Sequence, residues 1–470
     1  MKIEQIYTGC LSQGSYYIIS ENEAIIIDPL RETEPYLKKA EQDGVKIKYI
    51  LETHFHADFV SGHIDLAKKT GATIVYGPNA NPSYPVYIAQ DGEQLTFGKL
   101  SFKVLHTPGH TMESTCFLLM DESGKESALF SGDTLFIGDV GRPDLAQKSA
   151  SMTQEQLAGL LYHSLRDKIM TLPDEVVVYP AHGAGSACGK NMSKETSDLL
   201  GNQKKTNYAL RTDMSESDFI KEVTDGLLPP PGYFGMNVAM NKQGYDDYDS
   251  VLKRGLNPLS IESFEAILNE TDDILILDTR TSSEFAKCFI PGTISIGLEG
   301  QFAPWVGALI SDVKQKIALV TEIGKEEETI RRLSRVGYDN VVGYLNGGIE
   351  NWKNTGRDTD FIERITADDL QIEINNKTTI IDVRKPGEFQ AEHIENVPNI
   401  PLDFMNEHMH EFPQNDSFIL HCAGGYRSII AASILKSRGY KHVKDVIGGY
   451  SAISKTNIKR TNFVCPSTLK

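Results

Sequence analysis

The sequence contains no long apolar run, although 40% of its 470 residues are hydrophobic. A membrane-spanning helix needs about 20 consecutive apolar residues, so none is expected. The first residues, Met1–Tyr7, also lack the basic stretch followed by an apolar one that marks a secretory signal. These absences predict a soluble globular protein, long enough to form two to four domains with substantial cores.

Positive charge and cysteine are also scarce. The formal net charge is −17, which argues against nucleic acid or an anionic membrane surface as the main partner. The six cysteines form no C-x-x-C pair, and their spacing suggests no disulfide framework. This usage fits a reducing cytoplasm best. The six are Cys10, Cys116, Cys188, Cys288, Cys422 and Cys465.

Metal-binding residue types gather in one short stretch, Thr53–His63, directly after the apolar run 47–51. Three later strand-like runs also end in a loop that carries such a residue. A strand gives a rigid base, and donors that recur at strand exits therefore predict a metal site. The donors are His54, His56, Asp58 and His63 in the first loop, and His110, Asp133 and His182 in the later ones.

These motifs resemble the metallo-β-lactamase fold: H-x-H-x-D is followed in order by P-G-H-T, G-D-T and A-H-G. The run Ser131–Leu145 resembles the persulfide dioxygenase branch of that fold more narrowly. The resemblance spans about the first half of the chain and implies an αββα sandwich. It also implies that His54, His110 and Asp133 are the metal ligands. Two imidazoles and one carboxylate with open positions form the facial triad that suits non-haem Fe(II) and oxygen.

One position departs from the hydrolases of this fold, which carry a further histidine directly after the H-x-H-x-D motif. Phe59 occupies that position here. Without an imidazole there, a second metal is disfavoured, and we expect one Fe(II) per chain. His56, Asp58 and His182 then become groups that orient the ligands or contact substrate, and His56 also remains possible as an extra ligand.

Two further residues near these motifs each allow two interpretations. Arg142, in the run 141–144, could bind a substrate carboxylate or phosphate, or it could hold its loop through a salt bridge. Cys188 closely follows the His182 loop and could line the metal pocket and handle sulfur. A packed structural thiol is the alternative for Cys188.

The character of the chain changes between about 201 and 260. Charged runs at 204–208 and 215–222 favour helices, and the Pro-rich run Leu227–Phe234 breaks any regular element. We expect the aromatic residues of this run to pack on the first domain, because they should not remain in solvent. The segment Asn241–Pro258 is interpreted as a linker.

Beyond residue 260 the sequence repeats itself at an offset of 104 residues. Asp278-Thr279-Arg280 matches Asp382-Val383-Arg384, and Glu-Phe, isoleucine and Gly-Gly positions recur in both copies. Each copy has about a hundred residues of alternating strand and helix patterns, which suggests a small parallel-sheet α/β domain. The shared pattern resembles the rhodanese module twice over.

The two copies differ where a rhodanese carries its reactive cysteine. In the second copy Cys422 begins a loop that leads into a helix, where backbone N–H groups and the helix dipole stabilise a thiolate or a bound persulfide. Arg427 can face an anionic donor. The first copy has no cysteine between Cys288 and Cys422 and carries Glu326–Glu328 instead, so we expect it to be inactive, with a structural or docking role.

The combined prediction is an α/β multidomain chain in three parts. Residues 1–245 form an αββα metallo-β-lactamase-like dioxygenase domain with a Pro-rich extension. Residues 258–357 form an inactive rhodanese domain, and residues 362–470 form an active one. Both rhodanese domains are small parallel-sheet α/β units.

The predicted function is a fused persulfide dioxygenase and sulfurtransferase. The expected partners are O₂, sulfite or thiosulfate, and a small thiol persulfide of glutathione, coenzyme A or a similar thiol. Cys422, Arg427 and Cys188 are the candidate catalytic residues, and the fold relatives make a homo-oligomer plausible. The alternatives are a binuclear zinc thioester hydrolase of the glyoxalase II type with rhodanese domains, and a sulfur-carrier scaffold. Only the dioxygenase consumes O₂.

Overall fold

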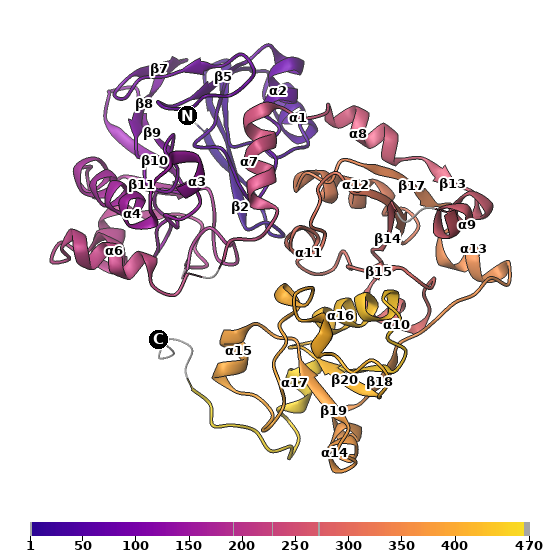
Figure 1. The fold of residues 1–470 in the computed structure, drawn as a ribbon. Helices are drawn as coiled ribbons and strands as arrows, with labels where there is room; N and C mark the ends of the chain where they lie inside the picture. Colours follow the sequence, from indigo (N-terminus) through magenta and orange to yellow (C-terminus); the bar gives the residue numbers. More distant parts are fainter. Residues whose placement is uncertain (1, 191, 228, 271–272, 465–470) are drawn as a thin grey trace. The chain divides into compact units, whose positions relative to one another are not determined.

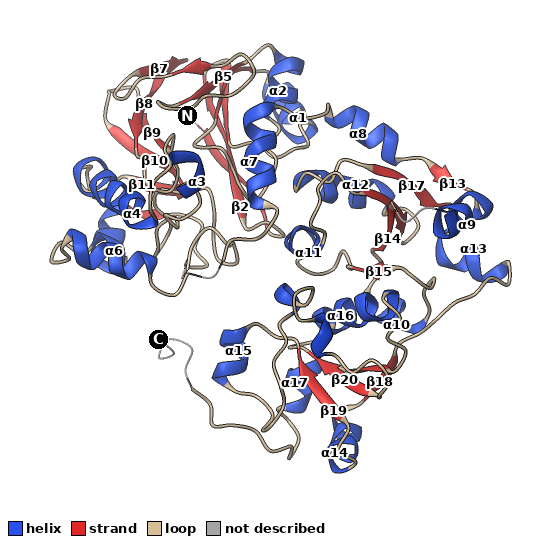
Figure 2. Cartoon of the chain, viewed as in Figure 1, coloured by secondary structure: helices blue, strands red, loops and turns tan. Residues whose placement is uncertain are grey.

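A computed structural model describes residues 2–190, 192–227, 229–270 and 273–464. They fold into two compact units of mixed helices and strands (Figures 1 and 2). The first comprises residues 1–248 together with 334–337, and the second comprises 249–333 and 338–470. None of the helices in the described residues is long and apolar enough to cross a membrane.

Two six-stranded sheets form the centre of the first unit. The first sheet follows chain order, β1-β2-β3-β4-β5-β6, and the second runs β12-β11-β10-β9-β8-β7. The expected antiparallel pairing of the early strands is confirmed, because β2 and β3 pair in that sense. The strands are β1 (Lys2–Thr8), β2 (Gln13–Ser20), β3 (Glu23–Ile27), β4 (Lys46–Leu51), β5 (Thr73–Tyr76), β6 (Tyr87–Ile88), β7 (Gln94–Phe97), β8 (Leu100–His106), β9 (Thr115–Met120), β10 (Glu126–Gly132), β11 (Val177–Pro180) and β12 (Asp198–Leu199).

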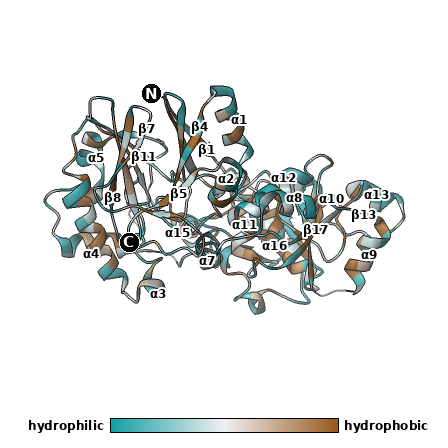
Figure 3. Cartoon of the chain, turned by 90° about the horizontal axis from the view of Figure 1, so that it is seen from above, coloured by the Kyte–Doolittle hydropathy of each residue, from teal (hydrophilic) through white to brown (hydrophobic). Residues whose placement is uncertain are grey.

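Strands β2, β3 and β9 are buried on both faces, whereas β1, β6, β7 and β12 carry exposed side chains. On β3, Ile25 and Ile27 pack in a core shared with strands of the second sheet, including Phe117 and Phe130. Ile26, which lies between them, points to the opposite face of the sheet. There it packs in an apolar cluster with residues of the covering helices. Figure 3 shows the apolar stretches of β4 and β5 in brown and much of the outer helix α1 (Glu34–Asp43) in teal. Because strand residues alternate between faces, strands buried on both sides need apolar residues at nearly every position.

Helices cover the outer face of each sheet, which completes the expected αββα order. Those on the first sheet include α1 and α2 (His63–Thr70), and Gly71 ends α2 as predicted. A separate apolar cluster joins the second sheet to the remaining outer helices. These other helices of the first unit are α3 (Gln147–Ala150), α4 (Gln154–His163), the π-helix Ser164–Ile169, α5 (Leu200–Thr206), the 3₁₀ turn Tyr208–Leu210, α6 (Glu216–Thr224) and α7 (Phe234–Gln243).

The segment Asn241–Pro258 contains the boundary between the two units, at residues 248 and 249, and so joins them as a linker would, but it is largely helical. Its first residues belong to α7, and most of the remainder forms α8 (Tyr248–Gly255). The sequence did not reveal that a polar residue of this segment serves packing: Asn241 is 1% exposed despite its amide. The aromatic residues ahead of it, Tyr233 and Phe234, are buried as expected.

The second unit contains two small parallel sheets, as the repeat predicted. Their orders are β13-β17-β16-β14-β15 and β18-β21-β20-β19, and the pairings within both are parallel. The strands are β13 (Pro258–Leu259), β14 (Ile274–Asp278), β15 (Ile294–Ser295), β16 (Lys316–Val320), β17 (Val341–Leu345), β18 (Glu363–Ile365), β19 (Thr379–Asp382), β20 (Phe418–His421) and β21 (Val443–Val446).

The helices of the second unit also recur in the two copies. The first copy has α9 (Ile261–Glu270), α10 (Ser282–Lys287), α11 (Phe302–Leu309), α12 (Glu326–Arg335) and α13 (Gly348–Asn354). The second copy has α14 (Ala367–Asn375), α15 (Pro386–Ala391), two 3₁₀ turns (Leu402–Phe404 and Met409–Glu411), α16 (Tyr426–Ser437) and α17 (Gly449–Ile453).

The repeated D-x-R motif makes the same contacts in both copies. Arg280 donates to the carboxylate of Asp278 and to the carbonyl of Cys288, and Arg384 donates to Asp382 and to the carbonyl of Glu392. Each arginine therefore connects the end of a central strand to the end of the following helix. The motif is structural in both copies, since it persists in the copy that lacks the cysteine.

Candidate functional site

The predicted metal donors all follow strand ends of the first unit. β3 and β4 are parallel, as are β10 and β11, so their carboxyl ends meet at one edge of the sandwich. His54 follows β4, His110 follows β8, and Asp133 follows β10 directly. The strands are held by the core, and this gives the loops a rigid base.

His54, His110 and Asp133 form a buried group whose ligand atoms lie within 4.8 Å of one another. The Nε2 atoms of His54 and His110 lie 3.8 and 3.4 Å from the same oxygen, Oδ2 of Asp133. His110 Nε2 and Asp133 Oδ2 are buried and make no hydrogen bond among the described residues. Because buried polar atoms are almost always paired, these unpaired atoms fit a bound metal.

The remaining ring nitrogens of the two histidines are held by neighbours. His110 Nδ1 lies 2.9 Å from the carbonyl of Arg142, and His54 Nδ1 lies 3.0 Å from the Thr53 hydroxyl. Donation from Nδ1 to a carbonyl leaves Nε2 as the free acceptor, the form that binds metal. The backbone of Gly141 packs directly against two of the ligand residues. A Cβ added to Gly141 would lie 2.0 Å from the Asp133 carbonyl and 2.9 Å from the His110 ring.

Charge at the group also favours metal binding. Burial, reinforced by His56, holds the pKa of His54 well below its ordinary value, which keeps the imidazole neutral. Burial alone would raise the pKa of Asp133, but His182 outweighs it and the pKa is lowered, so the carboxylate is ionised. Neutral imidazole and ionised carboxylate are the ligand forms that metals require.

A second buried group, Asp58, His182 and Cys188, adjoins the first. His182 Nδ1 lies 2.7 Å from Asp133 Oδ1, and its Nε2 lies 2.8 Å from Asp58 Oδ2. Burial lowers the pKa of His182, but the two carboxylates outweigh it and raise the pKa well above its ordinary value. Burial raises the pKa of the Cys188 thiol, and Asp133 raises it further. The structure thus brings these predicted residues together, and the role of each remains a prediction.

His56 packs on His54, with ring centroids 4.2 Å apart, but its Nε2 faces two other buried carboxylates. Its Nε2 is 3.1 Å from Asp28 Oδ1 and 3.8 Å from Glu52 Oε2, and its ring packs on Phe59 with centroids 4.4 Å apart. Asp28 also accepts hydrogen bonds from the Thr53 N–H and hydroxyl, both at 2.8 Å. Asp28 and His56 therefore hold the loop that presents His54, which agrees with an orienting role for His56.

Cys422 lies at the other predicted site, in the loop between β20 and α16. Its sulfur accepts hydrogen bonds from the Gly425 N–H at 3.1 Å and from the Ser428 hydroxyl at 3.4 Å. Gly425 has φ of 103°, a conformation that favours glycine and turns its N–H toward the sulfur. The loop thus surrounds the sulfur with donors, as the sequence predicted.

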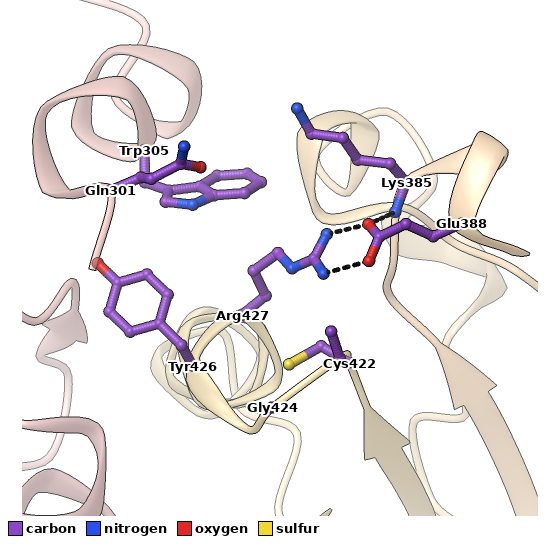
Figure 4. A pocket seen from close by; sticks show the side chains of 9 residues that line it. Gln301, Trp305, Lys385, Glu388, Cys422, Gly424, Tyr426 and Arg427 are labelled. Carbon is purple, nitrogen blue, oxygen red and sulfur yellow. Dashed lines mark hydrogen bonds and ion pairs between the residues drawn. The ribbon is translucent and has the colours of Figure 1, made fainter. Parts of the chain in front are cut away.

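A cavity of about 360 Å³ opens at this loop (Figure 4). Arg427 lines it, but both guanidinium NH groups pair with the carboxylate of Glu388, at 2.6 and 2.8 Å. The opposite side is formed by Gln301 and Trp305, which belong to the first copy and had no signal in the sequence. The copy that lacks a counterpart of Cys422 therefore supplies part of the wall of the cavity at Cys422.

Known families match both halves of the chain. A model of the metallo-beta-lactamase superfamily matches residues 8–182, and a model of the rhodanese-like domain matches 260–355 and 366–456. The human protein named "Persulfide dioxygenase ETHE1, mitochondrial" is 34% identical over 221 residues, which are 47% of this chain and 78% of that protein. The chain belongs to the metallo-β-lactamase superfamily. It also carries two rhodanese-like domains, and the predicted fold class is confirmed.

Other members of the superfamily differ in activity. A hydroxyacylglutathione hydrolase of Francisella philomiragia is 38% identical over 174 residues, which are 37% of this chain and 63% of that hydrolase. A solved metallo-beta-lactamase structure from Staphylococcus aureus is 32% identical with a TM-score of 0.65, and the match covers 73% of this chain and 98% of that one. Membership of the superfamily thus establishes an enzyme of this fold, and the choice of chemistry rests on the site.

Of the two interpretations of Arg142, the salt bridge agrees with the structure. Its Nε and Nη2 donate to the carboxylate of Asp144 at 2.6 and 2.7 Å, and Nη1 donates to the Ala187 carbonyl at 3.2 Å. The side chain is 6% exposed. Its guanidinium contacts its own loop, and its carbonyl lies against His110 Nδ1. A contact of Arg142 with substrate stays a prediction.

Asn241 is a site residue that sequence reasoning missed. From α7 its amide nitrogen donates to the carbonyls of His56 and Phe59, both at 2.8 Å, and its oxygen accepts from the Ser61 N–H at 2.9 Å. One side chain thus fixes the backbone of the metal loop at three points across 180 residues of sequence. No local pattern marks it, whereas Asp28 and Glu52 could have been found as acidic residues that end apolar strands.

We expect Asn241→Ala to loosen the metal loop. The variant loses three hydrogen bonds that together contribute about 2–3 kcal/mol, which lowers the midpoint of the first unit's thermal unfolding by roughly 5–10 °C. Metal affinity should fall as well, because His54 is presented by the same loop. Calorimetry and metal titration measure both effects. Gln243→Ala, an exposed change at the end of the same helix, is the control, and equal behaviour of the two variants would contradict the assignment.

Proposed function

We propose that the first unit is a persulfide dioxygenase that binds one Fe(II) through His54, His110 and Asp133. The observation that carries this proposal is the convergence of two Nε2 atoms on one carboxylate oxygen. Within the described residues, neither His110 Nε2 nor Asp133 Oδ2 makes a hydrogen bond. Two histidines and one carboxylate with open positions form the donor set of non-haem Fe(II) oxygenases. The likeness to ETHE1 over 221 residues supports the same chemistry.

The overall reaction takes a thiol persulfide, O₂ and water to the free thiol, sulfite and two protons. Bound iron would supply the oxygen chemistry. The protein orients the ligands: the Arg142 carbonyl fixes His110, and His182 holds the second oxygen of Asp133. Asp58 pairs with the far side of His182 and keeps it charged, which stabilises the ionised Asp133. We propose glutathione and coenzyme A persulfides as the substrates to test.

Asp133→Ala should lose iron and persulfide-dependent oxygen uptake together, since the carboxylate is a ligand and a partner of His182. Metal analysis of anaerobically purified protein and an oxygen electrode measure the two losses. The control is Asp213→Ala, an exposed residue whose carboxylate pairs with Arg211. Two tightly bound zinc ions per chain in active protein would contradict the one-iron proposal.

A zinc thioester hydrolase is the second candidate, and one observation favours it. Asp58, His182 and Cys188 lie beside the first donor group and could hold a second metal, although Phe59 supplies no imidazole. The hydrolase of Francisella philomiragia is also somewhat more identical than ETHE1, over a shorter match. The same oxygen electrode separates the candidates, because thioester hydrolysis consumes no O₂.

We propose further that Cys422 transfers sulfane sulfur. The Cys422 thiolate attacks the outer sulfur of thiosulfate, a sulfur–sulfur bond forms at Cys422, and sulfite leaves with the electron pair of the broken bond. In the reverse direction, sulfite formed by the dioxygenase takes the sulfur from the Cys422 persulfide and becomes thiosulfate. Donors around the sulfur, including Gly425 N–H, stabilise both anionic forms.

The first rhodanese copy should have no sulfurtransferase activity of its own. Its loop after β16 has no cysteine, and α12 opens with three glutamates that repel an anionic donor. A folded fragment of residues 260–357 should therefore fail to transfer sulfur from thiosulfate to cyanide. In the full chain, Cys422→Ser should abolish the transfer completely. Activity in either protein would refute the prediction.

Cys422→Ser also separates the two proposed activities. The residue is 1% exposed and the exchange nearly preserves its size, so folding should survive. A serine hydroxyl is hardly ionised at neutral pH and cannot carry sulfane sulfur. With excess persulfide, wild type should accumulate thiosulfate, and the variant should accumulate sulfite at a similar rate of oxygen use. Ion chromatography at early times measures the ratio, before spontaneous reaction of sulfite with persulfide blurs it. Equal early ratios would show that Cys422 does not couple the reactions.

A further inference from the structure

The cavity at Cys422 is larger than an inorganic sulfur donor requires. It encloses about 360 Å³, a volume in the range of pockets that hold small organic molecules. Thiosulfate is far smaller and would occupy only the part of this space that adjoins the Cys422 sulfur. The rest of the cavity therefore has room for a donor that carries an organic body on its reactive sulfur.

The charges that line the cavity are arranged poorly for a small dianion. Arg427 directs both NH groups to the carboxylate of Glu388, at 2.6 and 2.8 Å (Figure 4). Burial alone would raise the pKa of Glu388, but Arg427 outweighs it and the pKa is lowered, so the carboxylate is ionised and the pair is neutral. A dianion at Cys422 thus has to compete with Glu388 for the guanidinium. Among the described residues that line the cavity, the other cation is Lys385, which is exposed.

The wall that the first copy supplies suits the body of an organic molecule. Figure 4 shows the indole ring of Trp305 and the amide of Gln301 beside the space that Arg427 also lines. A flat aromatic face packs against apolar and amide groups, and a side-chain amide both donates and accepts hydrogen bonds. Lys385 lies on the other side of the cavity in the same view. These groups together fit a molecule that contains amides and carries a carboxylate.

Contacts between the two copies hold this wall in a fixed place. Tyr426, the first residue of α16, donates its hydroxyl to the Gly297 carbonyl at 2.7 Å. Gly300 packs directly on the Tyr426 ring, since a Cβ added to Gly300 would lie 2.3 Å from it. Gln301 is the next residue of the chain and begins the turn into α11. The wall is therefore anchored at the helix that follows the Cys422 loop.

We propose that Gln301 and Trp305, together with Lys385, form a subsite that selects an organic thiol persulfide as the sulfur donor of Cys422. The preferred donor has an amide-containing body that packs on the first copy and a carboxylate that binds Lys385. This inference rests on the proposed sulfur transfer by Cys422 and adds the class of its donor. Thiosulfate competes with Glu388 for Arg427, so it is held weakly and leaves as a product.

The transfer breaks one sulfur–sulfur bond and forms another. The Cys422 thiolate attacks the outer sulfur of the persulfide, which becomes bonded to Cys422 and keeps its proton. The sulfur–sulfur bond of the donor breaks, and the inner sulfur leaves as a thiolate with the electron pair. No oxidant or reductant is consumed, because the sulfane sulfur only changes its carrier. Gln301 and Trp305 contact the body of the leaving thiol, so their effect is on recognition of the donor.

The test compares two donors in the full chain without oxygen, so that the proposed dioxygenase does not consume the persulfide. Rate constants for loading sulfur onto Cys422 from glutathione persulfide and from thiosulfate are read from the alkylated Cys422 peptide by mass spectrometry. Trp305→Ala should lower the rate constant for glutathione persulfide about tenfold more than that for thiosulfate. Gln301 is exposed, so Gln301→Ala should fold even where Trp305→Ala does not, and its selective loss should be about threefold.

Trp352→Ala is the control for a general weakening of the first copy. Trp352 packs in the apolar core of that copy and does not line the Cys422 cavity. Its truncation should change both rate constants by the same factor. If Trp305→Ala and Gln301→Ala also affect the two donors equally, or affect neither, the subsite is overturned.

Lys385→Gln tests the proposed contact with the carboxylate. The rate constant for glutathione persulfide should fall about two- to fivefold, as expected for an exposed ion pair. The loss should be absent with the persulfide of cysteamine, which has no carboxylate. Lys377→Gln, which changes an exposed lysine of the same copy outside the cavity, should resemble wild type. An equal loss with both persulfides would contradict the assigned contact.

A binding measurement distinguishes failure of the subsite from failure of the transfer. If neither donor loads sulfur onto Cys422 in wild type, the proposed transfer is wrong. Calorimetric titration with glutathione, the leaving thiol, then compares Cys422→Ser with the same variant that also carries Gln301→Ala and Lys385→Gln. Weaker binding to the triple variant supports the subsite, and equal binding overturns it. If both donors load Cys422 but no variant changes their ratio, the transfer stands and the subsite is wrong.

Discussion

The core shared by the two six-stranded sheets fixes the ends of the strands, and the metal site depends on those ends. Ile25 and Ile27 of β3 pack against aromatic residues of the opposite sheet. His110 and Asp133 then project from β8 and β10, whose positions the same core sets. Because the donors come from separate loops, their convergence on one carboxylate oxygen follows from the rigidity of the strands rather than from any one loop.

The loops themselves are fixed by buried polar groups that do not belong to the donor set. Asp28 holds the backbone and hydroxyl of Thr53, and Asn241 holds the carbonyls of His56 and Phe59. Such contacts are worth about 1 kcal/mol each when formed, and more is lost when a buried partner is left unpaired. A metal site needs this support because ligand positions must be accurate to a fraction of an ångström.

The two rhodanese copies share one architecture, but only the second carries a cysteine in the loop before its α16 helix. Arg280 and Arg384 make the same contacts, so the fold tolerates loss of the reactive cysteine in one copy. The first copy contributes to the surroundings of Cys422, since its Trp305 lines the cavity there. Two hydrogen-bond donors surround the Cys422 sulfur, the Gly425 N–H and the Ser428 hydroxyl.

The sequence by itself determined the superfamily, the rhodanese repeat, the three ligand candidates and Cys422, because these residues sit in local motifs beside strongly apolar strands. Only the tertiary structure showed the salt bridge of Arg142 and the contacts of His56. The same holds for the hydrogen bonds of Asn241 and for the position of Trp305 at the Cys422 cavity. These depend on contacts between residues far apart in sequence, where local pattern carries no signal. Asn241 shows the reason: nothing near it in the sequence marks the residue, and only burial against the metal loop lets its amide hold Ser61, 180 residues earlier in the chain.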